Sequence, residues 1–175
     1  MKSINFTRFL LFALFLIGSI YTVDAQKKPK SPPKTTSQTI GTLQVDINYN
    51  APSVRGRKIW GGLEAYGEVW RTGANSATTF EINEDVTIGG DVLPAGKYAF
   101  FTIPDKEYWT IIFNKEADQW GAYNYQESKD VMRLRLTPNY EHEFTEQMTF
   151  DISEDGEVSL MWEKLKVSFN LIAEK

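Results

Sequence analysis

The apolar residues of this chain recur at every second position, and this period limits the folds that are open to it. In the segment 43–50, the apolar side chains Leu43, Val45, Ile47 and Tyr49 alternate with polar ones. Successive side chains of a strand point to opposite faces, so this alternation is typical of a strand with one face buried. No window of helical period is longer than two turns. The sequence therefore predicts a chain built from strands.

The same reasoning predicts about nine strands, separated by turn residues every eight to twelve positions. Regular spacing of this kind favours an antiparallel all-β fold. Because the connections are both short and long, we expect an antiparallel β-sandwich of jelly-roll or immunoglobulin-like kind. The expected strands cover residues 43–50, 77–82, 84–88, 97–103, 108–113, 131–137, 144–152, 158–162 and 165–171.

The N-terminal residues have the pattern of a secretory signal peptide. A basic start precedes the apolar run 9–17, and small Ala25 lies before Gln26. This run is shorter than the roughly 20 apolar residues of a membrane anchor. We therefore expect residues 1–25 to be a signal peptide that is cleaved after Ala25. The protein is then periplasmic or secreted, with no membrane span after cleavage.

Two parts with different charge are expected after the cleavage position. Residues 26–38 are rich in lysine and proline, which predicts a disordered tether, and residues 39–175 form a single β-sandwich domain. From residue 39 onward the chain has 13 basic and 22 acidic residues, a net charge of −9. Nucleic-acid binding needs a basic face, so no nucleic-acid partner is expected.

No residue pattern predicts catalytic machinery, a metal site or a cofactor. The chain has no cysteine, and its single histidine, His142, lies in a polar Glu-His-Glu stretch that we interpret as an exposed turn. Dedicated transition-metal sites need three or four ligands. Hydrolysis by a pair of carboxylates remains an alternative. Acidic residues lie near aromatic ones at Glu64, Glu68, Asp118 and Glu163.

The segment 56–75 departs from the regular alternation and is rich in side chains used for recognition. It holds five glycines, two tryptophans and two arginines. An arginine offers a planar fork to a carboxylate, a phosphate or a diol, and a tryptophan offers a flat face to a sugar ring. We hypothesise a ligand site near the edge of the sandwich that contains Trp60, Trp70, Arg71, Asn75 and, from a second aromatic loop, Trp120.

A structural interpretation of the same segment stays open. In that interpretation Arg71 pairs internally with an acidic residue, Trp70 fills the core, and the glycines allow tight turns. In both interpretations Arg71 and Asn75 are expected to belong to one polar cluster near the edge of the sandwich.

The same region resembles a known family. The runs 49–61, 70–75 (Trp-Arg-Thr-Gly-Ala-Asn) and 93–98 (Leu-Pro-Ala-Gly-Lys-Tyr) are similar to the family named domain of unknown function 2911 (DUF2911), which is common in exported proteins of Bacteroidetes-type bacteria. The similarity covers essentially residues 37–172. It implies an exported single-domain protein and marks Arg57 and Thr72 as further motif positions, which join the hypothesised ligand-binding residues. The family name assigns no activity, so no catalytic residue is carried over.

These observations predict a non-catalytic binding module of the cell envelope, whose partner is a small molecule, a glycan or an envelope protein. One alternative is an envelope hydrolase that acts on a glycan or ester through paired carboxylates. The other is a purely structural envelope module, in which Arg57 and Arg71 are buried in internal ion pairs with no cavity beside them.

Overall fold

The computed structural model describes residues 29–173 of the 175-residue chain. The predicted signal peptide at residues 1–25, with its cleavage position after Ala25, lies outside the described residues, as does the start of the predicted tether at residues 26–28. Within the described part, no helix has the length and apolar character needed to cross a membrane.

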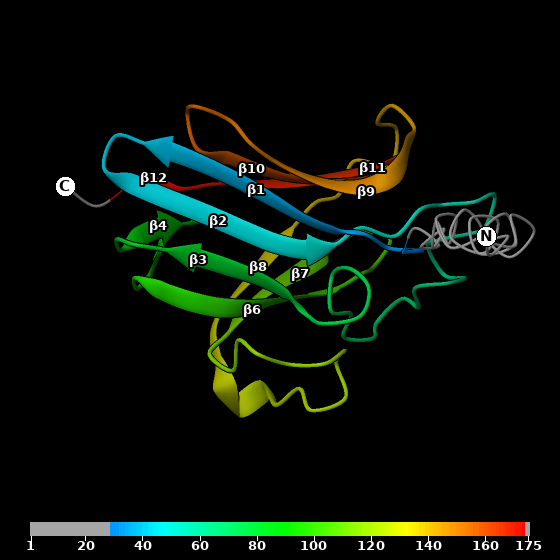
Figure 1. The fold of residues 1–175 in the computed structure, drawn as a ribbon, viewed down its shortest axis with the longest axis horizontal. Helices are drawn as coiled ribbons and strands as arrows, with labels where there is room; N and C mark the ends of the chain where they lie inside the picture. Colours follow the sequence, from blue (N-terminus) through cyan, green and yellow to red (C-terminus); the bar gives the residue numbers. More distant parts are fainter. Residues whose placement is uncertain (1–28, 174–175) are drawn as a thin grey trace, which may run out of the picture.

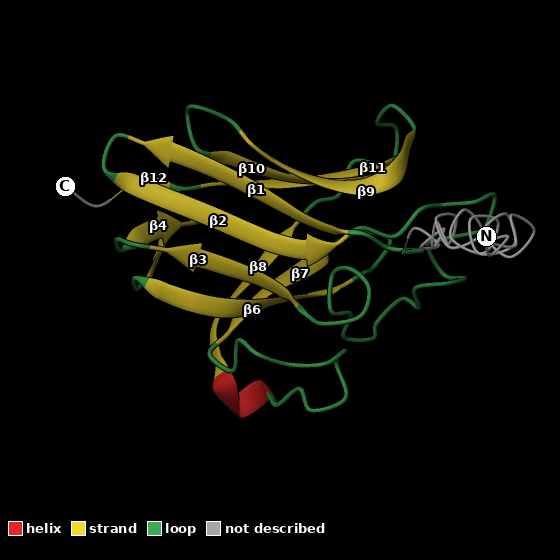
Figure 2. Ribbon diagram, viewed as in Figure 1, coloured by secondary structure: helices red, strands yellow, loops and turns green. Residues whose placement is uncertain are grey.

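The described chain is an all-β structure of antiparallel strands, which confirms the predicted fold class. Figure 2 shows a molecule made of strands and loops, with one short 3₁₀ helix at Glu127–Lys129. Residues 29–173 contain twelve strands: β1 (Pro33–Ile40), β2 (Leu43–Asn50), β3 (Thr78–Ile82), β4 (Val86–Ile88), β5 (Asp91–Leu93), β6 (Gly96–Ile103), β7 (Trp109–Asn114), β8 (Asp130–Leu136), β9 (Thr145–Ile152), β10 (Glu157–Glu163), β11 (Leu165–Asn170) and β12 (Ile172–Ala173).

The strands form two packed layers and one small sheet (Figure 1). The larger layer is a six-stranded sheet in the order β1-β2-β3-β6-β7-β8, and the smaller layer has the order β11-β10-β9. The short strands β12, β4 and β5 form the third sheet. At one edge the two layers are joined, because the Thr36 hydroxyl of β1 donates a hydrogen bond to the Phe150 carbonyl of β9 at 3.0 Å.

Alternation along the strands places one face of each layer in a shared core. In β2 the four apolar side chains are buried, whereas the residues between them are exposed or half-buried. Aromatic rings from both layers meet at the centre of this core. The Phe100 ring lies 5.4 Å from Phe113 and 5.6 Å from Phe150, both in T-shaped contacts, and stacks on Phe169 at 6.2 Å. Such pairs add about 0.5–1.5 kcal/mol each beyond burial.

Strand β6 is buried on both faces, because the loop between β7 and β8 covers its outer side. Ala99, Phe101 and Ile112 form a second small core there, and Tyr125 of the loop contacts Phe101 edge-on at 5.1 Å. The Tyr125 hydroxyl donates to Asp130 at 2.6 Å, which fixes the loop. The loop thereby comes to lie beside the strands of the large sheet.

Three of the observed strands, β1, β5 and β12, are not among the nine predicted from the sequence. Strand β1 starts at Pro33, so the prediction of a disordered tether over residues 26–38 is wrong from residue 33 onward. It pairs along its whole length with β2, from Pro33 opposite Asn50 to Ile40 opposite Leu43. Its residues are alternately exposed and half-buried, so the strand lacks the apolar alternation on which the prediction relied.

The long connection between β2 and β3, residues 51–77, gathers at one end of the sandwich (Figure 1). The described chain also begins at this end, whereas β12 lies toward the opposite end. The candidate site is therefore built by loops at the end where β2 finishes.

Replacing Phe100 by Ala is expected to lower the free energy of unfolding by about 3–5 kcal/mol, because it leaves a cavity among the central aromatic rings. Urea unfolding followed by circular dichroism measures the change. Phe144→Ala is a matched control, since this ring is 56% exposed, and its effect should stay within about 0.5 kcal/mol. Equal losses in the two variants would contradict the described core.

Candidate functional site

The run 70–75 is held by the backbones of two strands. Trp70 and Thr102 of β6 exchange both backbone hydrogen bonds, at 2.8 and 2.9 Å. Four residues later, the Ala74 amide donates to the Asn50 carbonyl at the end of β2, at 3.0 Å. The short segment between these two attachments has little freedom to move.

Thr72 has a backbone conformation that is unusual for a β-branched residue, with φ of 51°. It is fully buried, its hydroxyl donates to the Thr102 hydroxyl at 3.1 Å, and its carbonyl accepts from the Thr78 hydroxyl at 2.7 Å. Conformations of this kind cost about 1–3 kcal/mol and persist where the surroundings hold them. Trp70, two positions before Thr72, is buried as well, whereas Arg71 between the two is only half-buried.

Four tryptophans form a cluster beneath this loop. The Trp60 ring lies 4.9 Å from Trp109 and 5.6 Å from Trp162, and the Trp70 ring stacks on Trp162 at 5.8 Å. Trp60 and Trp70 are only 7% and 4% exposed. The structure thus places Trp60, Trp70 and Thr72, three of the predicted ligand-binding residues, in the core. They support the candidate site from inside and do not line it.

A pocket of about 210 Å³ lies beside the loop, and two of the predicted residues, Arg57 and Arg71, line it together with Glu64. We refer to it as the arginine pocket. Lys30 and Arg55 also line it, so the pocket brings together four cationic side chains and a single carboxylate. This is a local excess of positive charge in an acidic domain.

Neither Arg57 nor Arg71 belongs to an ion pair within residues 29–173. The Arg57 guanidinium donates to the carbonyls of Val54 at 3.1 Å and Ser53 at 2.6 Å, which hold the group without cancelling its charge. Nε of Arg71 is buried and has no hydrogen-bond partner among the described residues. Buried donors without acceptors are rare. The indole Nε1 atoms of Trp60 and Trp162 in the tryptophan cluster also lack one, but among these three donors only Arg71 lines the pocket.

Glu64 is fixed in a tight turn and has unusual electrostatics. Its amide donates to the Ile59 carbonyl at 3.0 Å, and its carbonyl accepts from Gly61 at 2.8 Å. Burial raises the pKa of Glu64 to about 7, against the opposing effect of the nearby Arg71 and Arg57. The Glu64 carboxyl therefore exchanges a proton near neutral pH.

The other two predicted residues, Asn75 and Trp120, do not line the arginine pocket. The Asn75 side chain donates to Asn50 Oδ1 at 3.3 Å. Trp120 is 64% exposed and lies opposite Ser76 in a β-bridge. Within the described residues no hydrogen bond joins Arg71 to Asn75, so the single polar cluster expected from the sequence divides into two separate places.

The other carboxylates considered for hydrolysis do not accompany Glu64 in the pocket. Asp118 lies 3.9 Å from the Lys97 ammonium, and the Glu163 carboxylate accepts the Lys164 amide at 2.7 Å. Glu68 is exposed. Across residues 29–173, no three His, Cys, Asp or Glu side chains come together as metal ligands.

Two pocket residues, Lys30 and Arg55, were not among those predicted from the sequence. Arg55 has φ of 50° and precedes Gly56, with φ of 67°, in a turn. Its guanidinium donates to the Lys30 carbonyl at 2.9 Å, which fixes the start of the described chain against this turn. The one available signal was the spacing of Arg55 and Arg57, two positions apart next to a glycine.

Fold and pocket together define an all-β sandwich domain with a cationic pocket in the loops at one end. Residues 31–171 match the family model described as protein of unknown function (DUF2911), and the chain belongs to this family. The match confirms the resemblance found in the sequence and includes β1. No curated protein and no solved structure matched the chain.

Replacing Arg71 by Ala is expected to change the free energy of unfolding by less than about 1 kcal/mol, because no carboxylate loses an ion-pair partner. Breaking a buried ion pair would cost about 3–5 kcal/mol instead. Chemical unfolding of the variant separates the two results. Trp60→Ala serves as the comparison and should lose about 3–5 kcal/mol. A loss of that size for Arg71→Ala would assign this arginine a structural role.

Glu64 is expected to make the protein less stable as the pH rises from about 4.5 to about 7. The folded chain keeps the proton up to about pH 7, whereas the unfolded chain releases it near the ordinary value of 4.5. The contribution of Glu64 to the free energy of unfolding is therefore fully present below pH 4.5. It falls by up to about 3 kcal/mol between pH 4.5 and pH 7 and stays constant above pH 7. Urea unfolding at several pH values measures it. Glu64→Gln should remove this part of the pH dependence, and an unchanged profile would contradict the assignment.

Proposed function

We propose that this protein is a non-catalytic binding module of the cell envelope, and that its arginine pocket binds a small organic anion bearing a carboxylate or phosphate group. The observation that carries the proposal is the unpaired charge of Arg57 and Arg71 in one pocket, together with the buried Nε of Arg71 that has no acceptor within residues 29–173. An arginine fork pairs with both oxygens of such an anion. The envelope location rests on the signal peptide predicted from the sequence.

The charge distribution supports an anionic ligand. The domain from residue 39 onward has a net charge of −9, yet Lys30, Arg55, Arg57 and Arg71 share one pocket with Glu64. A concave site lined by one sign of charge concentrates ions of the opposite sign. The main-chain carbonyls that hold Arg57 leave its positive charge intact. A bound anion would compensate this excess.

The backbone around the pocket supports tight binding. Thr72 is locked by side-chain hydrogen bonds, and Trp70 is fixed in the tryptophan cluster, so Arg71 between them is attached to a rigid segment. A site that is ordered before the ligand arrives loses less conformational entropy when the ligand binds.

Hydrolysis is a weaker candidate. One observation favours it, since Glu64 has a pKa of about 7 and stands in a pocket. Hydrolysis through paired carboxylates needs a second carboxylate at a distance of about 5–10 Å on the other side of the scissile bond. Glu64 is the one carboxylate that lines this pocket. A purely structural role is weaker still, because Arg57 and Arg71 line a pocket and belong to no ion pair among the described residues.

The test is a thermal-shift and calorimetric titration with inorganic phosphate, citrate and glucuronate, with glucose as the neutral probe. At least one of the anions should raise Tm and bind, and glucose should not bind at this pocket. Arg71→Ala should weaken anion binding roughly tenfold or more, the loss of one charge-assisted contact. Arg135→Ala is the matched control, because Arg135 lies over the Tyr108 ring and does not line the pocket. No response to any anion, or equal losses in the two variants, would refute the proposal.

Anion binding should also weaken as the pH rises through about 7. An anion in the pocket disfavours the charged form of Glu64, so the complex holds the proton to a higher pH than the free protein does. Titrations with glucuronate at pH 6 and pH 8 measure the difference in affinity, because its carboxylate stays ionised over this range, whereas phosphate itself changes charge. In Glu64→Gln the affinity should depend little on pH, and a dependence equal to that of the unaltered protein would contradict this coupling.

A further inference from the structure

The outward face of the large sheet carries a second hollow, separate from the arginine pocket. Its volume is about 450 Å³, and Thr35, Asn48, Asn50, Ser76 and Thr79 line it. We call it the outer-face groove. Thr35 pairs with Asn48 and Asn48 pairs with Thr79, so these three side chains form a row across β1, β2 and β3. The volume falls within the roughly 300–1,000 Å³ of small-ligand sites.

The side-chain amides of Asn48 and Asn50 are held so that their NH₂ groups are available to a ligand. Asn48 Oδ1 accepts a hydrogen bond from the Thr35 hydroxyl at 2.7 Å. Asn50 Oδ1 accepts one from the side-chain NH₂ group of Asn75 at 3.3 Å. Each carboxamide is thereby oriented through its oxygen, and its NH₂ group has no partner within residues 29–173. Two fixed, neutral donor groups therefore stand on adjacent positions of one sheet face, since both side chains point outward from β2.

An exposed indole is paired with a residue of this groove, although Trp120 is not itself one of the lining residues. The Gln119 carbonyl accepts the Ala77 amide at 2.9 Å, and the Gly121 amide donates to the Asn75 carbonyl at 3.0 Å, which places Trp120 directly opposite Ser76. Residues that face each other in an antiparallel pair have their side chains on the same side. Because Ser76 lines the groove, the indole of Trp120 emerges beside it, and it is 64% exposed.

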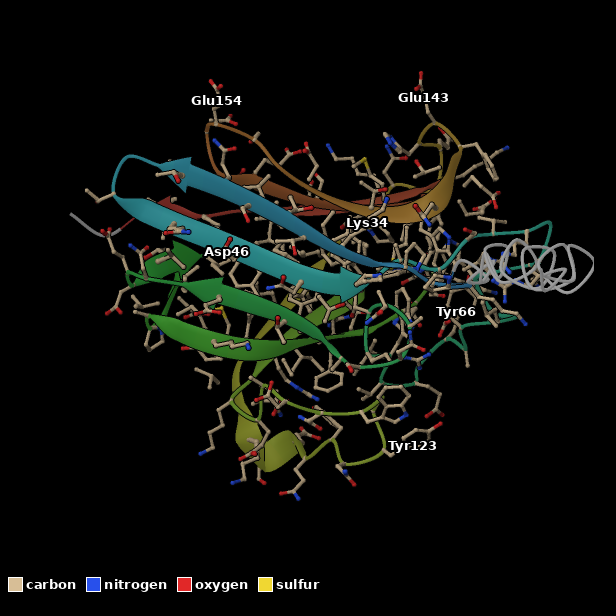
Figure 3. The ribbon with its side chains drawn as sticks, in the orientation of Figure 1. Lys34, Asp46, Tyr66, Tyr123, Glu143 and Glu154 are labelled. Carbon is tan, nitrogen blue, oxygen red and sulfur yellow. The ribbon has the colours of Figure 1, made fainter. Side chains whose placement is uncertain are left out.

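A second exposed aromatic ring belongs to the same loop. Tyr123 is 86% exposed, and Figure 3 shows it on the loop that projects from the large sheet. Two exposed aromatic rings, three positions apart, therefore belong to one loop.

We infer that the outer-face groove binds a neutral oligosaccharide, with one sugar ring against the indole of Trp120 and its hydroxyl groups paired with Asn48 and Asn50. A sugar ring has an apolar face of C–H groups and a rim of hydroxyls, and the groove offers one flat ring beside neutral amides and hydroxyls. Among the lining residues the sole charged one is Lys34, which lies on the inner-face register of β1 opposite Tyr49. The groove therefore lacks the paired charges that an ionic ligand needs.

This inference stands apart from the proposed anion site, because the two surfaces share no lining residue. Residues 73 and 74 line the arginine pocket, whereas residues 76 and 77 line the groove. Asn75 lies between the two surfaces and holds Asn50. A ligand of either surface is therefore testable without the other.

The experiment is affinity electrophoresis in native gels that contain one neutral polysaccharide each: xylan, galactomannan, mixed-linkage β-glucan or dextran. At least one should retard the protein, and calorimetry with the matching hexasaccharide then gives the affinity. Trp120→Ala should weaken this affinity about tenfold, the loss expected when a central aromatic contact is truncated. Asn48→Ala should weaken it severalfold, and Arg71→Ala should leave it unchanged.

The matched control is Phe144→Ala, another exposed aromatic ring. It follows Glu143, which Figure 3 shows on the opposite side of the molecule from Tyr123. This variant should bind as the unaltered protein does. Absence of retardation in all four gels would overturn the inference. Equal losses of polysaccharide affinity in Trp120→Ala and Phe144→Ala would also overturn it. A third contradicting result is retardation by the anionic polymer alginate alone, unchanged in Trp120→Ala.

Discussion

The backbone pairing of Trp70 with Thr102 is the attachment on which the functional end of this molecule depends. It fixes the long β2–β3 connection to the centre of the large sheet, and the tryptophan cluster then locks the Trp70 ring from below. Trp70 is buried and Thr72 is held at φ of 51°, and the intervening Arg71 lies half-buried in the lining of the arginine pocket. The position of its guanidinium thus follows from burial and backbone hydrogen bonding rather than from an ion pair.

The alternation of apolar residues was sufficient to predict nine strands and the sandwich, because burial of one strand face is a local pattern. The alternation was insufficient to predict β1, because the side chains of this strand are alternately exposed and half-buried. The strand forms through backbone pairing with β2. Pairing joins residues that are distant along the chain, and a single sequence carries little trace of it.

The site shows the same limit in another form. Trp60, Trp70 and Trp120 are the same residue type in similarly unusual surroundings, yet two lie in the core and one is exposed. Trp60 and Trp70 are buried against Trp109 and Trp162, which lie on strands of different layers. Arg57 and Arg71 could be proposed from their chemistry, whereas Lys30 and Arg55 join them only through the folding of the chain start onto the loop turn.

The placement of the chain ends has a practical consequence. Lys30 lines the arginine pocket, while β12 lies toward the opposite end of the sandwich (Figure 1). Immobilisation through the C-terminal side would hold the molecule on a sensor surface with the loops around Arg71 directed into the flow. Immobilisation through the N-terminal side would bring those loops against the support and hinder access to them. The side of attachment therefore decides how accessible this end of the molecule is in a surface-based measurement.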